Sequence, residues 1–402
     1  MTGFPTVIDA CYMAPSWLVG KMSTTSDSRL TYRTVNCRLL YIIGELHTGG
    51  SERQLYYLLR AMDRETYKPA VVVWNFCETD IYVASIRALG VPVYFFGETD
   101  SRATKLRQCR ALIKQLQPEI VHSWSFYTNF AAYWAAKGTS AVSLGSIRSD
   151  FLWAVQQCGS IVGKLSARWP RRQICNSAAA AESARRLKSY FSPSAVWVVQ
   201  NAVDFNEFAP SSVPTQRPPR ILGVGYLLPV KRWDLLLLTI EQLKKRRINF
   251  TAQIAGDGPL RAKLQALAED LGIVDQVQFL GHVDNVAKLL SEAAFVVHTG
   301  DAEGCPNAVM EAMASGRAVV AMDAGDIRAL VENGKTGFVV PSGDIAALRD
   351  QVGKLLADLP LCQAMGEAAR KKAENTFGLS KLVQETFEVY RHLGWQEIEP
   401  PC

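Results

Sequence analysis

The chain has 402 residues, of which 48% are hydrophobic and 20% are charged. This composition is typical of a globular protein, so it excludes a largely disordered chain and a fibrous one. The length predicts two to three domains. No run of about 18 apolar residues is present, which argues against a membrane-spanning helix. The N-terminus also lacks the basic-then-apolar layout of a secretory signal.

The charge is unevenly distributed along the chain. Residues 1–215 carry a net charge of +8, whereas the remainder carries −2. A basic half beside a mildly acidic half indicates that one domain meets an anionic ligand. No nucleic-acid-binding motif accompanies this charge, so we expect no nucleic acid partner. The nine cysteines show no CxxC spacing, which predicts free thiols in a reducing, cytoplasmic compartment rather than a zinc site.

Strands and helices alternate in the first half of the chain. Residues 1–36 show no steady period and are predicted to be a loose leader. The helices predicted after it begin near residues 51, 79 and 102. Alternation of this kind predicts a parallel sheet. The buried strands between these helices are predicted at 39–43, 70–74, 91–95 and 120–122.

A second series of the same kind follows a segment rich in Pro and Ser at residues 211–219. We therefore place a first domain at 37–213 and a second at 214–379, followed by a C-terminal helix and tail at 380–402. Two comparable α/β halves predict two Rossmann-like domains that face a cleft. The strands of the second half are predicted at 221–224, 251–255, 278–280, 295–298 and 318–321.

The most informative segment is residues 299–316. Glu303 lies in the loop that leaves a predicted strand, and Pro306-Asn307 is a credible helix start with Asn307 as its N-cap. Glu311 follows on the helical face of Asn307. The free N–H groups of this helix start favour an anion. A carboxylate on either side is suited to accept hydrogen bonds from sugar hydroxyls.

The run Glu303-Gly304-Cys305-Pro306-Asn307 through Glu311 resembles the E-x7-E signature of the retaining glycosyltransferase family 4. The resemblance extends from about Arg38 to Phe387. It implies a GT-B fold, with two Rossmann-like domains facing a cleft and a C-terminal helix that crosses back to the first domain. Further segments that are similar to the family's motifs are 48–53, 199–204, 224–231, 256–259 and 337–341.

The resemblance also implies roles for individual residues. Glu303 would contact the hydroxyls of the donor sugar, near the backbone of Gly304, Cys305, Pro306 and Asn307. The other implied donor contacts are Glu311 on the ribose, Lys231 on the diphosphate, Gly50 where the first helix approaches that diphosphate, and Val283 beside the base.

Three positions depart from the family pattern. Tyr226 stands where the family usually has Arg, which removes one diphosphate cation. Arg148 lies in a strand-end loop where many members have His, and it is the candidate catalytic replacement. The segment 325–329 replaces the usual G-G-x-x-E.

The expected function is that of a retaining glycosyltransferase. It would move a hexosyl-type sugar from a nucleotide-diphosphate sugar to a glycan or lipid-linked acceptor, in polysaccharide or glycoconjugate biosynthesis. No Asp-x-Asp motif is present to hold a metal, so activity without metal or cofactor is expected. The alternatives are a GT-B-like sugar-nucleotide epimerase and a non-catalytic nucleotide-sugar-binding subunit. The Glu303/Glu311 pair with Lys231 favours the transferase over the subunit, whereas Tyr226 favours the subunit.

The segment 161–172 alternates apolar and basic residues. Such a segment is suited to peripheral contact with an anionic membrane, here the inner membrane face, where lipid-linked acceptors reside. The alternative is an ordinary amphipathic helix with a solvated basic face.

Overall fold

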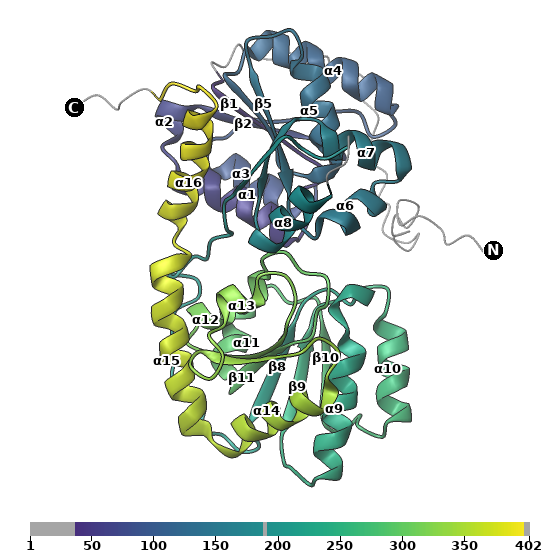
Figure 1. Cartoon of the computed structure of the whole chain (residues 1–402), viewed down its shortest axis with the longest axis vertical. Helices are drawn as coiled ribbons and strands as arrows, with labels where there is room; N and C mark the ends of the chain where they lie inside the picture. Colours follow the sequence, from purple (N-terminus) through teal and green to yellow (C-terminus); the bar gives the residue numbers. More distant parts are fainter. Residues whose placement is uncertain (1–36, 188–190, 398–402) are drawn as a thin grey trace, which may run out of the picture.

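The computed structural model describes residues 37–187 and 191–397, so the predicted leader at 1–36 lies outside the described residues. Two α/β domains lie one above the other, joined by the linker before residue 220 and by the helices at the C-terminal end (Figure 1). The fold is GT-B, as the sequence predicts. Within the described residues, no helix is both long enough and apolar enough to cross a membrane.

The first domain is built on a seven-stranded parallel sheet in the order β3-β2-β1-β4-β5-β6-β7. Its first strand, β1 (Leu39–Ile43), is fully buried, as expected for a parallel sheet covered by helices on both faces. The other strands are β2 (Pro69–Val73), β3 (Val93–Phe95), β4 (Ile120–Ser123), β5 (Val142–Ile147), β6 (Arg172–Cys175) and β7 (Ala195–Val198). The helices are α1 (Gly50–Ala61), α2 (Arg64–Tyr67), α3 (Ile81–Ala88), α4 (Arg102–Leu116), α5 (Asn129–Ala136), α6 (Phe151–Gln157), α7 (Ser160–Arg168) and α8 (Ala178–Arg186).

The second domain has a six-stranded parallel sheet in the order β10-β9-β8-β11-β12-β13. Its strands are β8 (Arg220–Val224), β9 (Thr251–Ala255), β10 (Val277–Gly281), β11 (Phe295–His298), β12 (Ala318–Met322) and β13 (Gly337–Val340). Its helices are α9 (Trp233–Lys245), α10 (Arg261–Asp270), α11 (Val286–Glu292), α12 (Asn307–Ala314), α13 (Ile327–Leu330), α14 (Ile345–Ala357) and α15 (Leu359–Thr376).

Both sheets change direction of winding beside their first strand, between β1 and β4 and between β8 and β11. In open α/β sheets, ligands bind outside the carboxyl ends of the strands at such a point. The loop before α1 follows β1, and the loop that carries Glu303 follows β11. The topology therefore places the two most informative sequence motifs at the two switch points.

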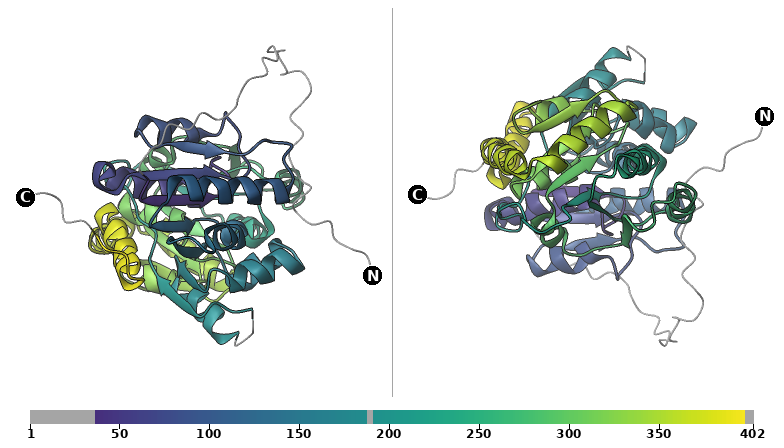
Figure 2. Two further views of the ribbon diagram at one scale, coloured as in Figure 1. Left: turned by 90° about the horizontal axis from the view of Figure 1, so that it is seen from above. Right: turned by 90° about the horizontal axis from the view of Figure 1, so that it is seen from below.

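The predicted C-terminal helix does cross back. Helix α16 (Leu379–His392) lies against α1 of the first domain, whereas α15 lies on the second domain (Figures 1 and 2). Tyr390 is buried there, 2.8 Å from Nδ1 of His122. The Trp395 indole donates to Glu119 at 2.5 Å. These apolar and polar contacts make the last helix part of the first domain's core.

Candidate active site between the domains

Glu303 lies just after β11, and its carboxylate is buried between two basic groups. Oε1 is 2.6 Å from Nζ of Lys231 and 3.3 Å from Nε2 of His298. Burial by itself raises the pKa of Glu303, but the charge of Lys231 and the contact with His298 outweigh it and lower the pKa to about 2. The side chain is therefore a carboxylate at neutral pH. The sequence predicts Lys231 near this site but assigns no role there to His298.

The two loops that carry this pair are fixed to each other. Lys231 ends a short 3-10 helix (Pro229–Lys231), and its carbonyl accepts a hydrogen bond from Thr299 Oγ1 at 2.8 Å. The backbone N–H of Asp301 donates to Val230 at 3.0 Å. The relative position of Lys231 and Glu303 thus depends on backbone contacts as well as on their charges.

Glu311 is buried on α12, and its partner comes from the other domain. Arg53, on α1, forms an ion pair with its Oε1. Burial raises the pKa of Glu311 above its usual value, and the charge of Arg53 opposes this shift only in part. At Arg53, burial lowers the pKa, but Glu311 together with the other acidic groups around it outweighs burial and raises the pKa of the guanidinium above the usual range. Sequence analysis included Arg53 in a motif but assigned it no role, because its partner is 258 positions away.

Gly50 and Asn307 meet across the domain boundary. A Cβ atom on Gly50 would lie 2.4 Å from Asn307 Nδ2, so a larger residue here would displace that side-chain amide. The side-chain amide oxygen of Asn307, Oδ1, accepts hydrogen bonds from Asn201 Nδ2 at 2.8 Å and from Gln54 Nε2 at 3.4 Å. Helix α12 begins at Asn307 with Pro306 as the preceding cap residue. The prediction that Asn307 is the N-cap is therefore wrong, because its amide is used between the domains.

Gly304 and Cys305 complete the loop before α12. A Cβ atom on Gly304 would lie 3.0 Å from Asn176 Oδ1 and 3.5 Å from the Cα of Ser149, both in the first domain. Cys305 is buried, and its carbonyl accepts from Asn201 Nδ2 at 3.2 Å. Burial raises the pKa of its thiol to about 12, so it is neutral.

Arg148 follows β5 and lies flat on Trp124, with its guanidinium carbon 3.7 Å from the ring centroid. Within the described part of the chain, its Nε and Nη1 atoms are buried without a hydrogen-bond partner. His122 is fully buried behind it and contacts Tyr390 and Ser146 through its two ring nitrogens. Burial and then the charge of Arg148 lower the pKa of His122 well below its usual range. His122 is thus a neutral structural histidine.

A further contact joins the domains at the segment that departs from the family motif. Asp326 accepts hydrogen bonds from Ser177 Oγ at 3.1 Å and from the backbone N–H groups of Ala178 and Ala179 at 2.8 and 2.9 Å. It therefore caps α8 of the other domain. Tyr226, which stands where the family usually has Arg, donates a hydrogen bond from its hydroxyl to the backbone carbonyl of Thr48 in the first domain.

Val283 follows β10, the edge strand of the second sheet. It is partly buried and packs against the hydrophobic cluster that includes Cys305 and Val309. Its predicted place beside the nucleotide base stays a prediction.

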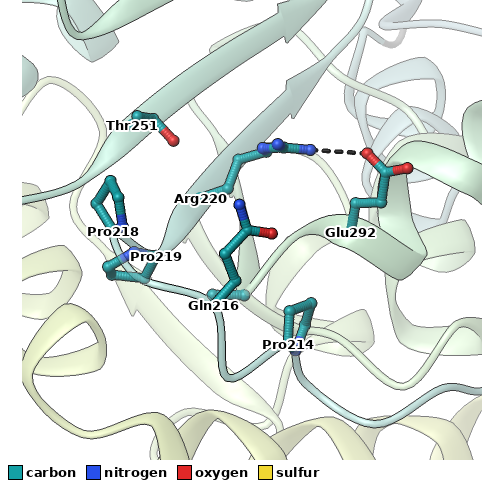
Figure 3. Close-up of a pocket in the computed structure, with 8 residues that line it drawn as sticks. Pro214, Gln216, Pro218, Pro219, Arg220, Thr251 and Glu292 are labelled. Carbon is teal, nitrogen blue, oxygen red and sulfur yellow. Dashed lines mark hydrogen bonds and ion pairs between the residues drawn. The ribbon is translucent and has the colours of Figure 1, made fainter.

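The pocket in Figure 3 is not part of this site. It is lined by the linker residues Pro214 to Pro219 and by the first residues of β8 and β9, and Arg220 pairs there with Glu292 at 2.7 Å. The pocket thus lies at the amino ends of the strands, whereas Glu303 lies beyond their carboxyl ends. Its position favours a structural role for the linker.

Comparison with known families bears on both domains. Residues 204–372 match the family model described as "Glycosyl transferases group 1", and residues 48–207 match "Glycosyltransferase Family 4". Each domain therefore matches a glycosyltransferase family model. The site described above lies where these two matched regions meet, and each region contributes residues to it.

Among curated relatives, an N-acetyl-alpha-D-glucosaminyl L-malate synthase of Bacillus anthracis is 34% identical over 137 residues, which is 34% of this chain and 36% of that protein. A GDP-mannose-dependent alpha-(1-6)-phosphatidylinositol monomannoside mannosyltransferase of Mycolicibacterium smegmatis is 32% identical over 204 residues, or 46% of this chain and 53% of that protein. The matches thus span about a third to a half of these relatives.

Solved structures share the fold over most of the chain. HepE of Anabaena in complex with UDP-glucose has a TM-score of 0.75 at 18% identity and covers 88% of this chain and 99% of its own. Sucrose-phosphate synthase of Thermosynechococcus elongatus has a TM-score of 0.71, also at 18% identity, and covers 89% of this chain and 99% of its own. At this identity the similarity shows the GT-B fold.

Proposed function

We propose that the protein is a retaining glycosyltransferase that transfers a sugar from a nucleoside diphosphate sugar to a glycan or lipid-linked acceptor in polysaccharide or glycoconjugate synthesis. The observation that carries this proposal is the buried, ionised Glu303 held by Lys231 at the switch point of the second sheet. It places a hydrogen-bond acceptor for sugar hydroxyls beside a cation for the diphosphate. UDP-glucose in the related HepE structure supports a donor of this class.

The residues divide the work as follows. Lys231 offsets the negative charge that builds up on the diphosphate as the sugar C1–O bond breaks. Glu303 accepts hydrogen bonds from the sugar, and these strengthen as C1 becomes cationic. Glu311 accepts hydrogen bonds from the ribose. Arg53 pairs with Glu311 and opposes the rise in its pKa that burial causes.

The anomeric configuration is retained if the diphosphate leaves and the acceptor hydroxyl attacks on the same face of the sugar. The bond from C1 to the diphosphate oxygen breaks, a bond from C1 to the acceptor hydroxyl forms, and the hydroxyl proton passes to the departing diphosphate oxygen. This route needs no carboxylate nucleophile. It uses the fixed charge of Lys231 in place of a divalent metal.

The surface of α6 and α7 supports an acceptor at a membrane. Ile161 is 72% exposed and Leu152 is 47% exposed. Lys164 is exposed on α7, and Arg171 and Arg172 are exposed where the chain leaves α7 for β6. Apolar side chains next to lysine and arginine are suited to an anionic lipid surface, so we propose peripheral contact there.

The deciding experiment incubates the protein with UDP-, GDP- and ADP-linked sugars and a panel of glycan and lipid-linked acceptors. A transferase forms a glycosylated acceptor and releases nucleoside diphosphate in equal amounts, and the anomeric configuration of the product reports retention. Conversion of one nucleotide sugar into another without release would indicate an epimerase. Binding without any conversion would indicate a non-catalytic subunit.

A further inference from the structure

Two buried arginines in the described part of the chain have opposite environments. Arg317 donates hydrogen bonds to the carbonyls of Leu290 and Ser211, both at 2.7 Å, and so fixes the domain linker. Arg148 has two buried nitrogens, Nε and Nη1, without any partner among the described residues. Arg317 is satisfied by the fold, and Arg148 is not.

An unpaired buried guanidinium lowers folding stability, because its lost hydration is not replaced. Burial lowers the pKa of Arg148 to about 10, which still leaves it charged at neutral pH. Stacking on Trp124 at 3.7 Å offsets part of the lost hydration but bonds neither free nitrogen. The missing partner is therefore an anion that the fold does not supply.

The neighbours of Arg148 indicate which anion. Its carbonyl accepts a hydrogen bond from Asn176 Nδ2 at 3.3 Å, and the other amide atom of Asn176 faces Gly304. Arg148 thus lies on the first-domain side of the loop that begins at Glu303, whereas Lys231 contacts the Glu303 carboxylate from the second domain. With Lys231 assigned to the diphosphate under the proposed function, Arg148 remains as a second cation on the first-domain side of this loop.

We propose that Arg148 binds a carboxylate on the transferred sugar, so that the donor is a nucleotide-linked sugar acid. This inference rests on the proposed function and narrows its donor. A planar guanidinium pairs with a carboxylate through two parallel hydrogen bonds, which a sugar hydroxymethyl group cannot reproduce. A neutral sugar would leave the guanidinium buried and unpaired. The free-energy cost of that unpaired group would favour the sugar acid over the neutral sugar.

The test compares matched donors that differ only at C6: UDP-glucuronic acid with UDP-glucose, and GDP-mannuronic acid with GDP-mannose. Their dissociation constants are measured by calorimetry, with UDP and GDP alone as references. For the base that binds, we expect the acid to bind at least about tenfold more tightly than the neutral sugar, which corresponds to about 1.4 kcal/mol. Arg148→Gln should bring this ratio close to one, and Arg148→Lys should leave an intermediate ratio.

Arg107→Gln, a change at an exposed arginine on α4 of the same domain, is the matched control and should keep the wild-type ratio. Thermal unfolding shows whether each variant is folded. Equal or tighter binding of the neutral sugars by the wild type would overturn the inference and leave the proposed function standing. An Arg148→Gln change that weakens the binding of free nucleoside diphosphate as much as the binding of the sugar acid would also overturn the inference. No binding of any nucleotide would instead overturn the proposed function itself.

Discussion

Arg53 of the first domain and Glu311 of the second form an ion pair whose carboxylate is almost completely buried, with 5% of the Glu311 side chain exposed. Removal of one partner leaves the other charge buried and unpaired, whereas removal of both does not. The pair therefore links the contact between the two domains to the charge of Glu311, the proposed ribose ligand.

We predict that Arg53→Met lowers the free energy of unfolding by about 3–5 kcal/mol. The double variant Arg53→Met with Glu311→Leu should recover part of this loss. Chemical denaturation of the wild type, both single variants and the double variant measures the coupling. Additive losses would contradict a role for the pair in stability.

The two glutamates should differ in kinetics. Glu311→Ala should raise the donor KM about ten- to a hundredfold with kcat nearly unchanged, because ribose contacts are alike in the ground and transition states. Glu303→Ala should lower kcat at least about tenfold and leave binding of free nucleoside diphosphate nearly unchanged, because its contacts tighten as the sugar bond breaks. Steady-state kinetics with nucleotide titration decides this. A folded Glu303→Ala variant with normal turnover would refute the assignment.

Glu303 also predicts how stability depends on pH. Its pKa in the folded state is about 2, below the usual value of 4.5. A lowered pKa contributes stability above the unfolded-state pKa, and this contribution is lost as the pH falls from about 5 to 2. Glu303→Gln should therefore show a shallower loss of stability over that range. Glu182→Gln, at an exposed position of α8, is the control and should follow the wild type.

Asp326 should act as a latch between the domains. Asp326→Ala removes a carboxylate that accepts hydrogen bonds from the first N–H groups of α8 in the other domain. The change should therefore favour a more open arrangement of the domains and lower the free energy of unfolding by about 0.5–2 kcal/mol. Asp344 caps α14 within its own domain, with 2.9 Å between Oδ1 and the Ala347 nitrogen. Asp344→Ala should therefore lower stability without an increase in the radius of gyration. Small-angle scattering of both variants distinguishes the two effects, and equal radii would refute the latch.

Activity should not require a metal ion, because Lys231 offers fixed positive charge at the proposed diphosphate site. After metal stripping, turnover in excess chelator should equal turnover in untreated buffer. Loss of turnover that added magnesium or manganese restores would show that this expectation is wrong.

The basic surface of α7 predicts binding to anionic vesicles that weakens at high salt, because exposed charges are screened. Sedimentation with vesicles should show reduced binding when Lys164, Arg168, Arg171 and Arg172 are changed to Gln. Equal binding of the two proteins, or no binding by either, would remove the proposed membrane contact.

The sequence alone determined the elements whose signals are local. The apolar run at 39–43 forms β1, and the spacing of Glu303 and Glu311 placed them on either side of the start of α12. The strands β6 and β7 were not identified as such. Several of their residues are only partly buried, as in β7, or are polar, as Arg172 and Gln173 in β6, so the pattern of a buried strand is weak there.

Only the tertiary structure decided the partners of the site residues. Arg53 and Glu311 are 258 positions apart, and Asp326 and Ser177 are 149 apart. No periodicity connects such pairs, because they meet only after two separately folded sheets are brought together. The isolation of Arg148 is of the same kind: the sequence shows a positive charge after a strand, but the absence of a partner depends on every element packed around it.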